Sequence, residues 1–95
     1  MSFEFEWDSK KAKANTKKHG VTFEEGTSVF ADPLAKIFND EDHSYKEKRE
    51  IIIGHSTNQR LILVSFTQVG TRIRLISARE ATLMERRDYE ENAES

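Results

Sequence analysis

The chain has 95 residues, of which 34% are charged, with one proline, no cysteine and a formal net charge of −2. This length fits one domain with a modest core, and the absence of cysteine excludes disulfides and thiolate metal sites. No apolar run approaches the roughly 20 residues of a membrane-spanning helix and no signal-peptide pattern follows the N-terminus, so we expect a single domain over 1–95 that works in the cytoplasm, away from membranes.

Basic residues are segregated along the chain. Residues 8–21 contain five lysines and one aspartate, and residues 71–87 contain five arginines and two glutamates. Residues 22–50 and 88–95 are acidic. If the two basic segments fold together, they form a basic patch in spite of the net charge. For the lysines alone, an ordinary solvated helix face is the alternative.

The first elements are predicted from alternation and capping residues. Residues 3–7 alternate apolar and acidic side chains, which is typical of a short strand at a sheet edge. Asp8 or Ser9 can cap a helix that runs to about Lys18 and is closed by Gly20. His19 at its end is either a packed partner of the helix dipole or a proton-transfer group, a role that histidine side chains commonly have.

The middle of the chain contains a second helix and two strands. Thr22 and Glu25 form a capping box for a helix to about Phe30, in which Gly26 costs up to about 1 kcal/mol relative to alanine. Strands are predicted over 34–38 and 47–54. Between them, Asp40, Asp42 and His43 could be read as metal ligands, but the segment lacks the glycine and distal glutamate of a calcium loop, so we favour a solvated turn.

The segment 60–79 is the most regular part of the sequence. Two runs rich in β-branched residues and leucine flank Gln68-Val69-Gly70, and glycine supplies the positive φ of a short loop. We predict strands 60–67 and 71–78 with Val64 opposite Arg74. One face then carries three arginines among apolar residues: Arg60, Arg72 and Arg74, with Ile62, Val64, Phe66 and Ile76. The other is an ordinary core face: Leu61, Leu63, Ser65, Thr67, Ile73, Leu75 and Ser77.

A last helix completes the chain. Ser77 and Glu80 resemble a second capping box, which predicts a helix over about 79–91 followed by a frayed tail within 90–95. The expected order is β-α-α-β-β-β-β-α. It describes an α+β domain in which helices pack against the leucine-rich face of an antiparallel meander.

Several sequence motifs in this order resemble one family. They are FEWD at the first strand, NTKKHGV at the first helix, FEE at the second, and RIRLISAREAT followed by ERRDY at the end. Together they span about Phe5 to Tyr89, and in this order they are similar to the BrnT toxin family. No single motif is specific enough alone.

The resemblance implies a fold, an activity and partners. The fold is expected to be RelE-like, and the protein is expected to be a ribonuclease toxin that stops translation. A BrnA-like antitoxin with a ribbon-helix-helix part is the expected protein partner. Operator DNA is expected to be bound only through that antitoxin. RelE-like toxins are commonly basic, whereas this chain is slightly acidic.

The chemistry of such a toxin suggests roles for residues on the predicted elements. Metal-independent RNA cleavage uses the 2′-hydroxyl of the substrate as nucleophile, so the enzyme must move two protons and stabilise charge on the phosphoryl oxygens. Arginine suits the last task, because it binds phosphate through two donors. We assign Arg60, Arg72 and Arg74 to phosphate contacts. Candidates for proton transfer are His19, Lys17 and Glu47, and candidates for RNA binding are Lys17, Lys18 and Arg79. No metal or other cofactor is expected.

Three alternatives stay open. Arg79 could instead form a structural ion pair with a nearby acid. The arginine face could mainly receive an acidic antitoxin segment, with catalysis weak or lost. The chain could also be a non-catalytic RNA-binding domain, since binding and cleavage need the same cations and stacking groups.

Overall fold

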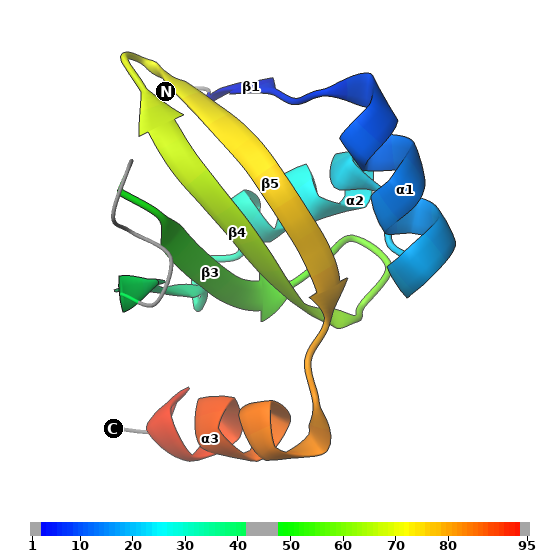
Figure 1. Ribbon diagram of the computed structural model, residues 1–95. Coiled ribbons are helices and arrows are strands. Elements are labelled where there is room, and N and C mark those ends of the chain that lie inside the picture. The colour runs from blue at the N-terminus through cyan, green and yellow to red at the C-terminus, as the bar shows by residue number, and fades with distance from the viewer. Residues whose placement is uncertain (1–2, 42–47, 94–95) are drawn as a thin grey trace.

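Five strands and three α-helices make up the computed structural model, which describes residues 3–41 and 48–93 (Figure 1). Along the chain they are β1 (Glu4–Glu6), α1 (Ser9–His19), α2 (Phe23–Ser28), a 3-10 helix η1 (Val29–Ala31), β2 (Lys36–Asn39), β3 (Glu50–His55), β4 (Leu61–Val69), β5 (Arg72–Glu80) and α3 (Leu83–Ala93). The α+β class is confirmed. Among the helices of the described residues, none has the length and the apolar composition that a membrane span requires.

The strands form one mixed sheet in the order β1-β5-β4-β3-β2. Strands β2 to β5 are the predicted antiparallel meander. Strand β1 lies at the edge and pairs in parallel with β5, with Glu6 in register with Arg74. The first strand therefore brings two glutamates beside the arginines of β5, although more than 60 residues separate them in sequence.

The predicted register of the β4–β5 hairpin is wrong. Thr67, rather than Val64, lies opposite Arg74, and the strands are joined by Gly70-Thr71, with Gly70 at φ +63°. A shift of three residues is odd, so it moves Arg72 and Arg74 to the sheet face opposite Arg60. A β-bulge then adds Ile76 to β5 between two neighbouring pairs, Phe66 with Leu75 and Ser65 with Ser77. After the bulge, the remaining residues of β5 lie on the sheet faces that the sequence predicted for them.

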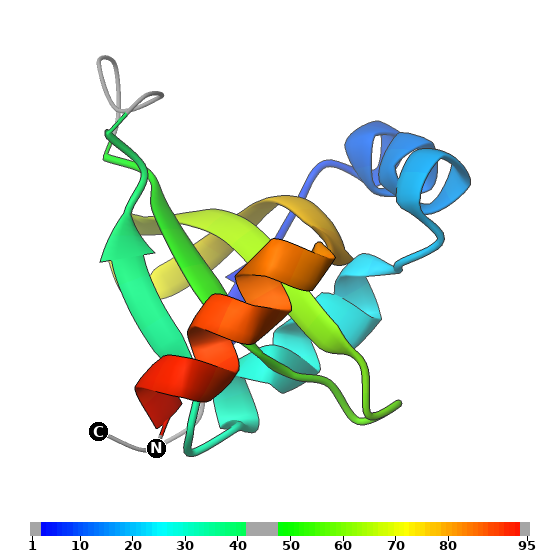
Figure 2. The same cartoon turned by 90° about the horizontal axis from the view of Figure 1, so that it is seen from below.

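The helices cover both faces of the sheet, which corrects the expectation that they share the leucine-rich face. On one face, α1, α2 and η1 pack on a large core comprising Val21, Phe23, Val29, Ile52, Ile62, Val64, Phe66, Ile73, Leu75 and Ala78. On the other, α3 covers a smaller core of Ile53, Leu61, Leu63 and Tyr89. Figure 2 shows α3 lying over the strands, away from α1.

Local signals position α1 as predicted. Asp8 is the N-cap, and its carboxylate accepts bonds from the backbone N–H groups of Lys10 and Lys11. Gly20 ends the helix in the left-handed conformation, at φ +71°. The buried Asn15 side chain then ties α1 to β5. Its amide donates to the carbonyls of Val21 and Ala78 at 3.0 and 2.8 Å and accepts from Ala78 N at 3.1 Å.

Helix α2 lies close against the hairpin because of Gly26. A Cβ added there would lie 3.3 Å from Leu75 Cδ2 and 3.4 Å from Val64 Cγ2. Gly26 therefore lets α2 cross the hairpin closely. Glycine at this position lowers the helix propensity of α2, but it allows α2 to lie close to the sheet.

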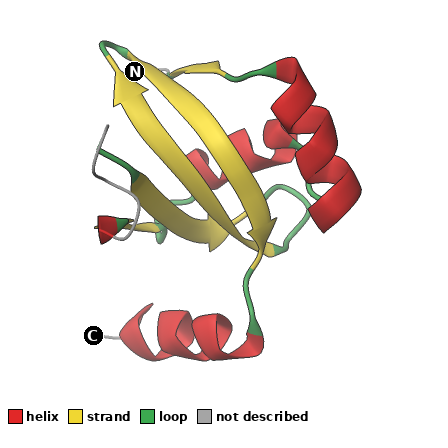
Figure 3. Cartoon of the chain, viewed as in Figure 1, coloured by secondary structure: helices red, strands yellow, loops and turns green. Residues whose placement is uncertain are grey.

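The start of α3 differs from the prediction. Ser77 and Glu80 stay in β5, because β5 pairs with β4 as far as Glu80 opposite Ile62. The capping box is instead formed by Thr82 and Glu85, where Thr82 Oγ1 accepts from Glu85 N and Glu85 accepts from Thr82 N. A short loop therefore separates β5 from α3 (Figure 3).

Candidate functional site

Two arginines and one glutamate form an exposed cluster at the β1 edge of the sheet, called here the strand-edge cluster. Glu6 Oε2 lies 2.8 Å from Arg74 Nε, and Glu6 Oε1 lies 3.3 Å from Arg72 Nη1. The arginine side chains are 58% and 46% exposed for Arg72 and Arg74, and that of Glu6 is 27% exposed. Each guanidinium therefore retains donors that a phosphate group can reach.

The sheet holds this cluster at a defined position. Ile73 and Leu75 point into the large core, so Arg72 and Arg74, which alternate with them, point to the opposite face. Arg74 is the register partner of the buried Thr67, whose hydroxyl donates to Lys48 O at 2.8 Å. Glu47, a predicted catalytic residue, lies outside the described residues, and Lys48 directly follows it.

Arg60 is not part of this cluster. Its side chain lies on the α1–α2 side, where Nε donates to Glu25 at 2.9 Å, Nη1 to Glu80 at 2.8 Å and Nη2 to Gly20 O at 3.1 Å. Glu25 is buried and also forms an ion pair with Arg60 Nη2. The hydrogen bonds from Arg60 hold the pKa of Glu25 below its usual value, and the pKa of Arg60 is raised in return. All three guanidinium nitrogens are thus used within the fold.

Arg79 joins the end of β5 to the start of α3. Its Nη1 and Nη2 donate to the two carboxylate oxygens of Glu85 at 2.8 and 2.9 Å. This bidentate pair lowers the pKa of Glu85 to about 2 and raises that of Arg79. The structural ion pair that the sequence left open for Arg79 is therefore present.

The remaining predicted residues lie on α1. Lys17 and Lys18 are exposed and His19 is half-buried at the C-terminal end of the helix. Because α1 packs on the face of the large core, these residues are on the other side of the sheet from the strand-edge cluster. The fold separates the predicted site residues into two groups and does not assemble them in one site.

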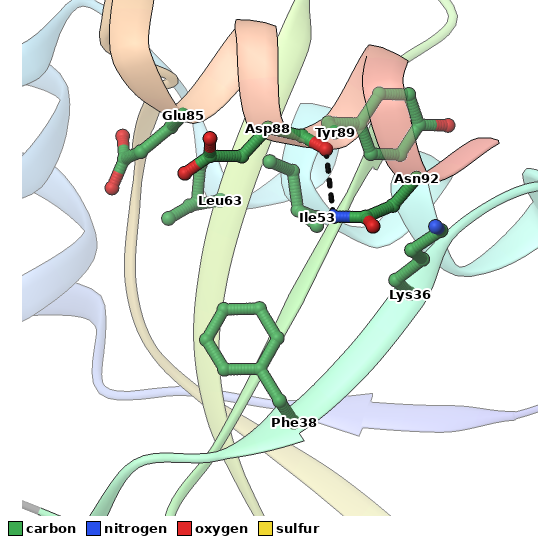
Figure 4. Close-up of a pocket in the computed structure, with 8 residues that line it drawn as sticks. All are labelled: Lys36, Phe38, Ile53, Leu63, Glu85, Asp88, Tyr89 and Asn92. Carbon is green, nitrogen blue, oxygen red and sulfur yellow. Dashed lines mark hydrogen bonds between the residues drawn. The ribbon is translucent and has the colours of Figure 1, made fainter.

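A pocket of about 200 Å³ opens between α3 and the sheet. Figure 4 shows Phe38 of β2 facing the side chains of α3 across it. Ile53 and Leu63 also line it, and its polar rim consists of Lys36, Glu85, Asp88 and Asn92. The carboxylates on the rim make this pocket less suited to a phosphate chain than the strand-edge cluster.

Sequence reasoning missed a cluster of Asp32, His55 and Tyr89 at the far end of β3. Asp32 Oδ2 accepts from His55 N at 2.7 Å and lies 3.6 Å from His55 Nδ1, and the imidazole packs edge-on against the Tyr89 ring. The pKa of Asp32 is lowered overall. Burial alone would raise this pKa, but the hydrogen bonds from the backbone N–H groups of His55 and Leu34 have the larger combined effect. These three residues are far apart in sequence, so no local pattern indicates that they meet.

No group of three or more His, Cys, Asp or Glu side chains within 3–41 and 48–93 is placed to hold a metal ion. Of the three residues considered as metal ligands, Asp42 and His43 lie outside these ranges.

Similarity to known proteins is found both in sequence and in structure. The model of a family described as the ribonuclease toxin BrnT of type II toxin–antitoxin systems matches residues 7–85. The crystal structure of the Brucella abortus ribonuclease toxin, BrnT, superposes with a TM-score of 0.65 at 28% sequence identity, covering 85% of this chain and 99% of that one. No curated protein sequence matches.

Proposed function

Because the chain belongs to the BrnT family of ribonuclease toxins of type II toxin–antitoxin systems, we propose that it cleaves RNA internally without a metal ion and so inhibits translation. The family match identifies a ribonuclease toxin. The site and the mechanism are our proposal. A RelE-like relationship also stays a prediction.

The observation that carries the proposal is the strand-edge cluster. Two arginines two residues apart on one strand, each ion-paired with the same carboxylate, present a cationic surface with a proton acceptor at its centre. Arginines on a paired strand have less freedom than arginines on loops, so their donors are better oriented for a phosphate group.

The cluster suggests a mechanism. Arg72 and Arg74 donate to the non-bridging oxygens of the scissile phosphate and stabilise the charge that builds up there. Glu6 accepts the proton of the 2′-hydroxyl, whose oxygen attacks phosphorus and forms a 2′,3′-cyclic phosphate. The P–O5′ bond breaks, and the 5′-oxygen takes a proton from a general acid. Glu47 is retained as a candidate for that acid.

Purified protein and total RNA test this mechanism. In excess chelator, the wild type should still cleave and leave cyclic phosphate ends. Glu6→Gln should reduce the rate on the order of a hundredfold, as expected for loss of a general base. Glu91→Gln is the matched control, since Glu91 is an exposed glutamate on α3 outside the cluster. Loss of wild-type cleavage in chelator would show that the reaction needs a metal.

A second candidate is a weak toxin that acts mainly by binding its antitoxin. The ion pairs of Glu6 with Arg72 and Arg74 favour this second candidate. Glu6 partly neutralises both arginines, so an RNA phosphate must compete with Glu6 for them. The Glu6→Gln variant separates the two. A faster rate than the wild type would mean that Glu6 masks the arginines, whereas a slower rate supports its role as base.

The family also implies an antitoxin partner. We propose that it is a BrnA-like protein with a ribbon-helix-helix part, that it covers the strand-edge cluster, and that the pair binds operator DNA through the antitoxin. Both RNA and antitoxin would be met in the cytoplasm.

A further inference from the structure

We propose that a groove beside α1 is a second RNA-contact surface, which binds a single-stranded segment through phosphates on Lys13 and Lys17 and a base on Trp7. This inference rests on RNA being the substrate, as proposed above. It adds a binding surface on the side of the sheet opposite the strand-edge cluster.

The groove is large enough for a nucleotide. It has a volume of about 500 Å³ and is lined by Trp7, Ser9, Ala12, Lys13, Thr16, Lys17 and Glu24. Trp7 is half-buried and packs edge-on against Phe23, with 5.8 Å between ring centroids. The indole is thus held in place, and a nucleobase can stack on a fixed aromatic ring at little entropic cost.

The charges along the groove fit a phosphate chain. Lys13 and Lys17 are one helical turn apart, and both are exposed. Among the residues that the structure describes, no carboxylate forms an ion pair with an α1 lysine, whereas Arg60, Arg72, Arg74 and Arg79 are each bonded to a glutamate. The lysine ammonium groups are therefore open to an external anion. Ser9 and Thr16 add hydroxyls that can bond to ribose or phosphate.

Glu24 allows the RNA-binding groove to be distinguished from an ordinary solvated helix face. Glu24 is the only acid among the described residues that line the groove. If RNA phosphates lie there, removing this negative charge should strengthen binding, while removing Lys13 and Lys17 should weaken it.

Trp7 is the only tryptophan of the chain, so its fluorescence reports on the groove directly. The probe is a 2′-O-methyl oligoribonucleotide, which has no free 2′-hydroxyl and cannot be cleaved. Wild-type emission should be quenched on titration. For Lys13→Gln/Lys17→Gln, binding should be about tenfold weaker, and the slope of log K against log salt should be less steep by about 1.4, which corresponds to two phosphate contacts.

Two variants serve as controls. Lys10→Gln/Lys11→Gln removes the same charge from the same helix, but neither residue lines the groove, so binding should weaken clearly less than it does for Lys13→Gln/Lys17→Gln. Glu24→Gln should bind more tightly than the wild type. Thermal melts confirm that each variant is folded.

The outcomes separate this inference from the proposed function. The groove is not the binding surface if the two lysine double variants weaken oligonucleotide binding equally. The same conclusion follows if anisotropy shows that the oligonucleotide is bound but Trp7 fluorescence is not quenched. If the wild type cleaves RNA in that case, the proposed function stands without it. If cleavage is absent but quenching depends on Lys13 and Lys17, the groove is upheld and the chain binds RNA without cutting it.

Discussion

At the scale of single residues, the burial of the carboxylate partner distinguishes one arginine from another. Glu25, which holds Arg60, has a side chain only 6% exposed, whereas Glu6, which holds Arg72 and Arg74, is 27% exposed. A phosphate can reach the second pair and displace its contacts. Arg60 is bound from three directions and acts as a structural link between α2 and the end of β5.

Replacing Arg74 by alanine should abolish most cleavage while the protein stays folded. Loss of one oriented transition-state donor typically costs about 3 kcal/mol in the barrier, or on the order of a hundredfold in rate. The exposed Arg74–Glu6 pair should contribute less than about 1 kcal/mol to stability. RNA cleavage in chelator and a thermal melt measure the two effects.

Arg86→Ala is the matched control for Arg74→Ala. Arg86 has a side chain 45% exposed, and its contact with Glu90 at 3.9 Å lies on α3. Its removal should leave the rate unchanged. If the folded Arg74→Ala protein cleaves at the wild-type rate, Arg74 has no place in the site.

Asn15 should be among the most sensitive residues for stability. Replacing it by alanine leaves the buried N–H and C=O of Ala78 without their side-chain partner, so we expect a loss of about 3 kcal/mol in the free energy of unfolding. Urea denaturation measures this value. Thr16→Ala removes the hydroxyl bonds to Ala12 O at 3.1 Å and to Val21 O at 3.4 Å, and it should cost less than about 1 kcal/mol. A similar loss in both variants would show that the buried Asn15 contacts are not special.

At the scale of elements, α3 is attached through few side chains. Tyr89 is its buried anchor and donates to Leu34 O at 3.2 Å, while Leu83 and Met84 are each 74% exposed. Its first turn is held by the Thr82 cap and by the Arg79–Glu85 pair. The position of α3 thus depends on polar contacts more than that of α1 and α2, which lie on the large core.

The Arg79–Glu85 pair should make stability depend on pH in a defined window. In the folded state the pKa of Glu85 is about 2, below the usual 4.5. The ionised Glu85 carboxylate therefore stabilises the fold fully above about pH 4.5, and this stabilisation is lost as the pH falls toward 2. Glu85→Gln should therefore destabilise the protein by about 1 kcal/mol at pH 7 and by much less near pH 2. Urea titrations at both pH values give the difference.

Glu90→Gln provides the comparison for this experiment. Glu90 is 63% exposed and lies on the same helix, and its contact with Arg86 is long. Its effect on the free energy of unfolding should be small at both pH values. A Glu85→Gln effect that does not shrink in acid would show that the ion pair is not its cause.

At the scale of the whole molecule, the two charged surfaces lie on opposite sides of the sheet. The arginines of β5 share the α3 side with the pocket, and the α1 lysines are on the side of the large core. A partner on one surface leaves the other accessible. An antitoxin that inhibits cleavage is expected on the arginine side, where it excludes the substrate.

The chain should form a tight complex with the small antitoxin encoded beside it. Co-expression and affinity purification at moderate salt should recover both proteins, and hydrogen exchange should slow at β1 and β5 in the complex. Glu6→Lys, which removes the carboxylate between the arginines, should leave the complex intact if the partner contacts the arginines with acidic groups. Absence of the neighbouring protein from the purified sample would refute the pairing.

Several features were readable from local sequence. Asp8 and Gly20 mark the ends of α1, Thr22 marks the start of α2, and alternating or β-branched runs mark the strands. Each signal acts within about one helical turn or one strand, so it does not depend on the rest of the chain. The family motifs added the expectation of a ribonuclease toxin, which the family match confirms.

Local sequence thus indicated most elements and the family, whereas the pairing of distant segments set which side chains meet. The two-residue loop and the bulge at Ile76 set the faces of Arg72 and Arg74, and parallel pairing of β1 brought Glu6 to them. The meeting of Asp32, His55 and Tyr89 has the same origin. Pairing between distant segments is set by the burial of both faces together, and an odd shift in register exchanges those faces without changing any local propensity.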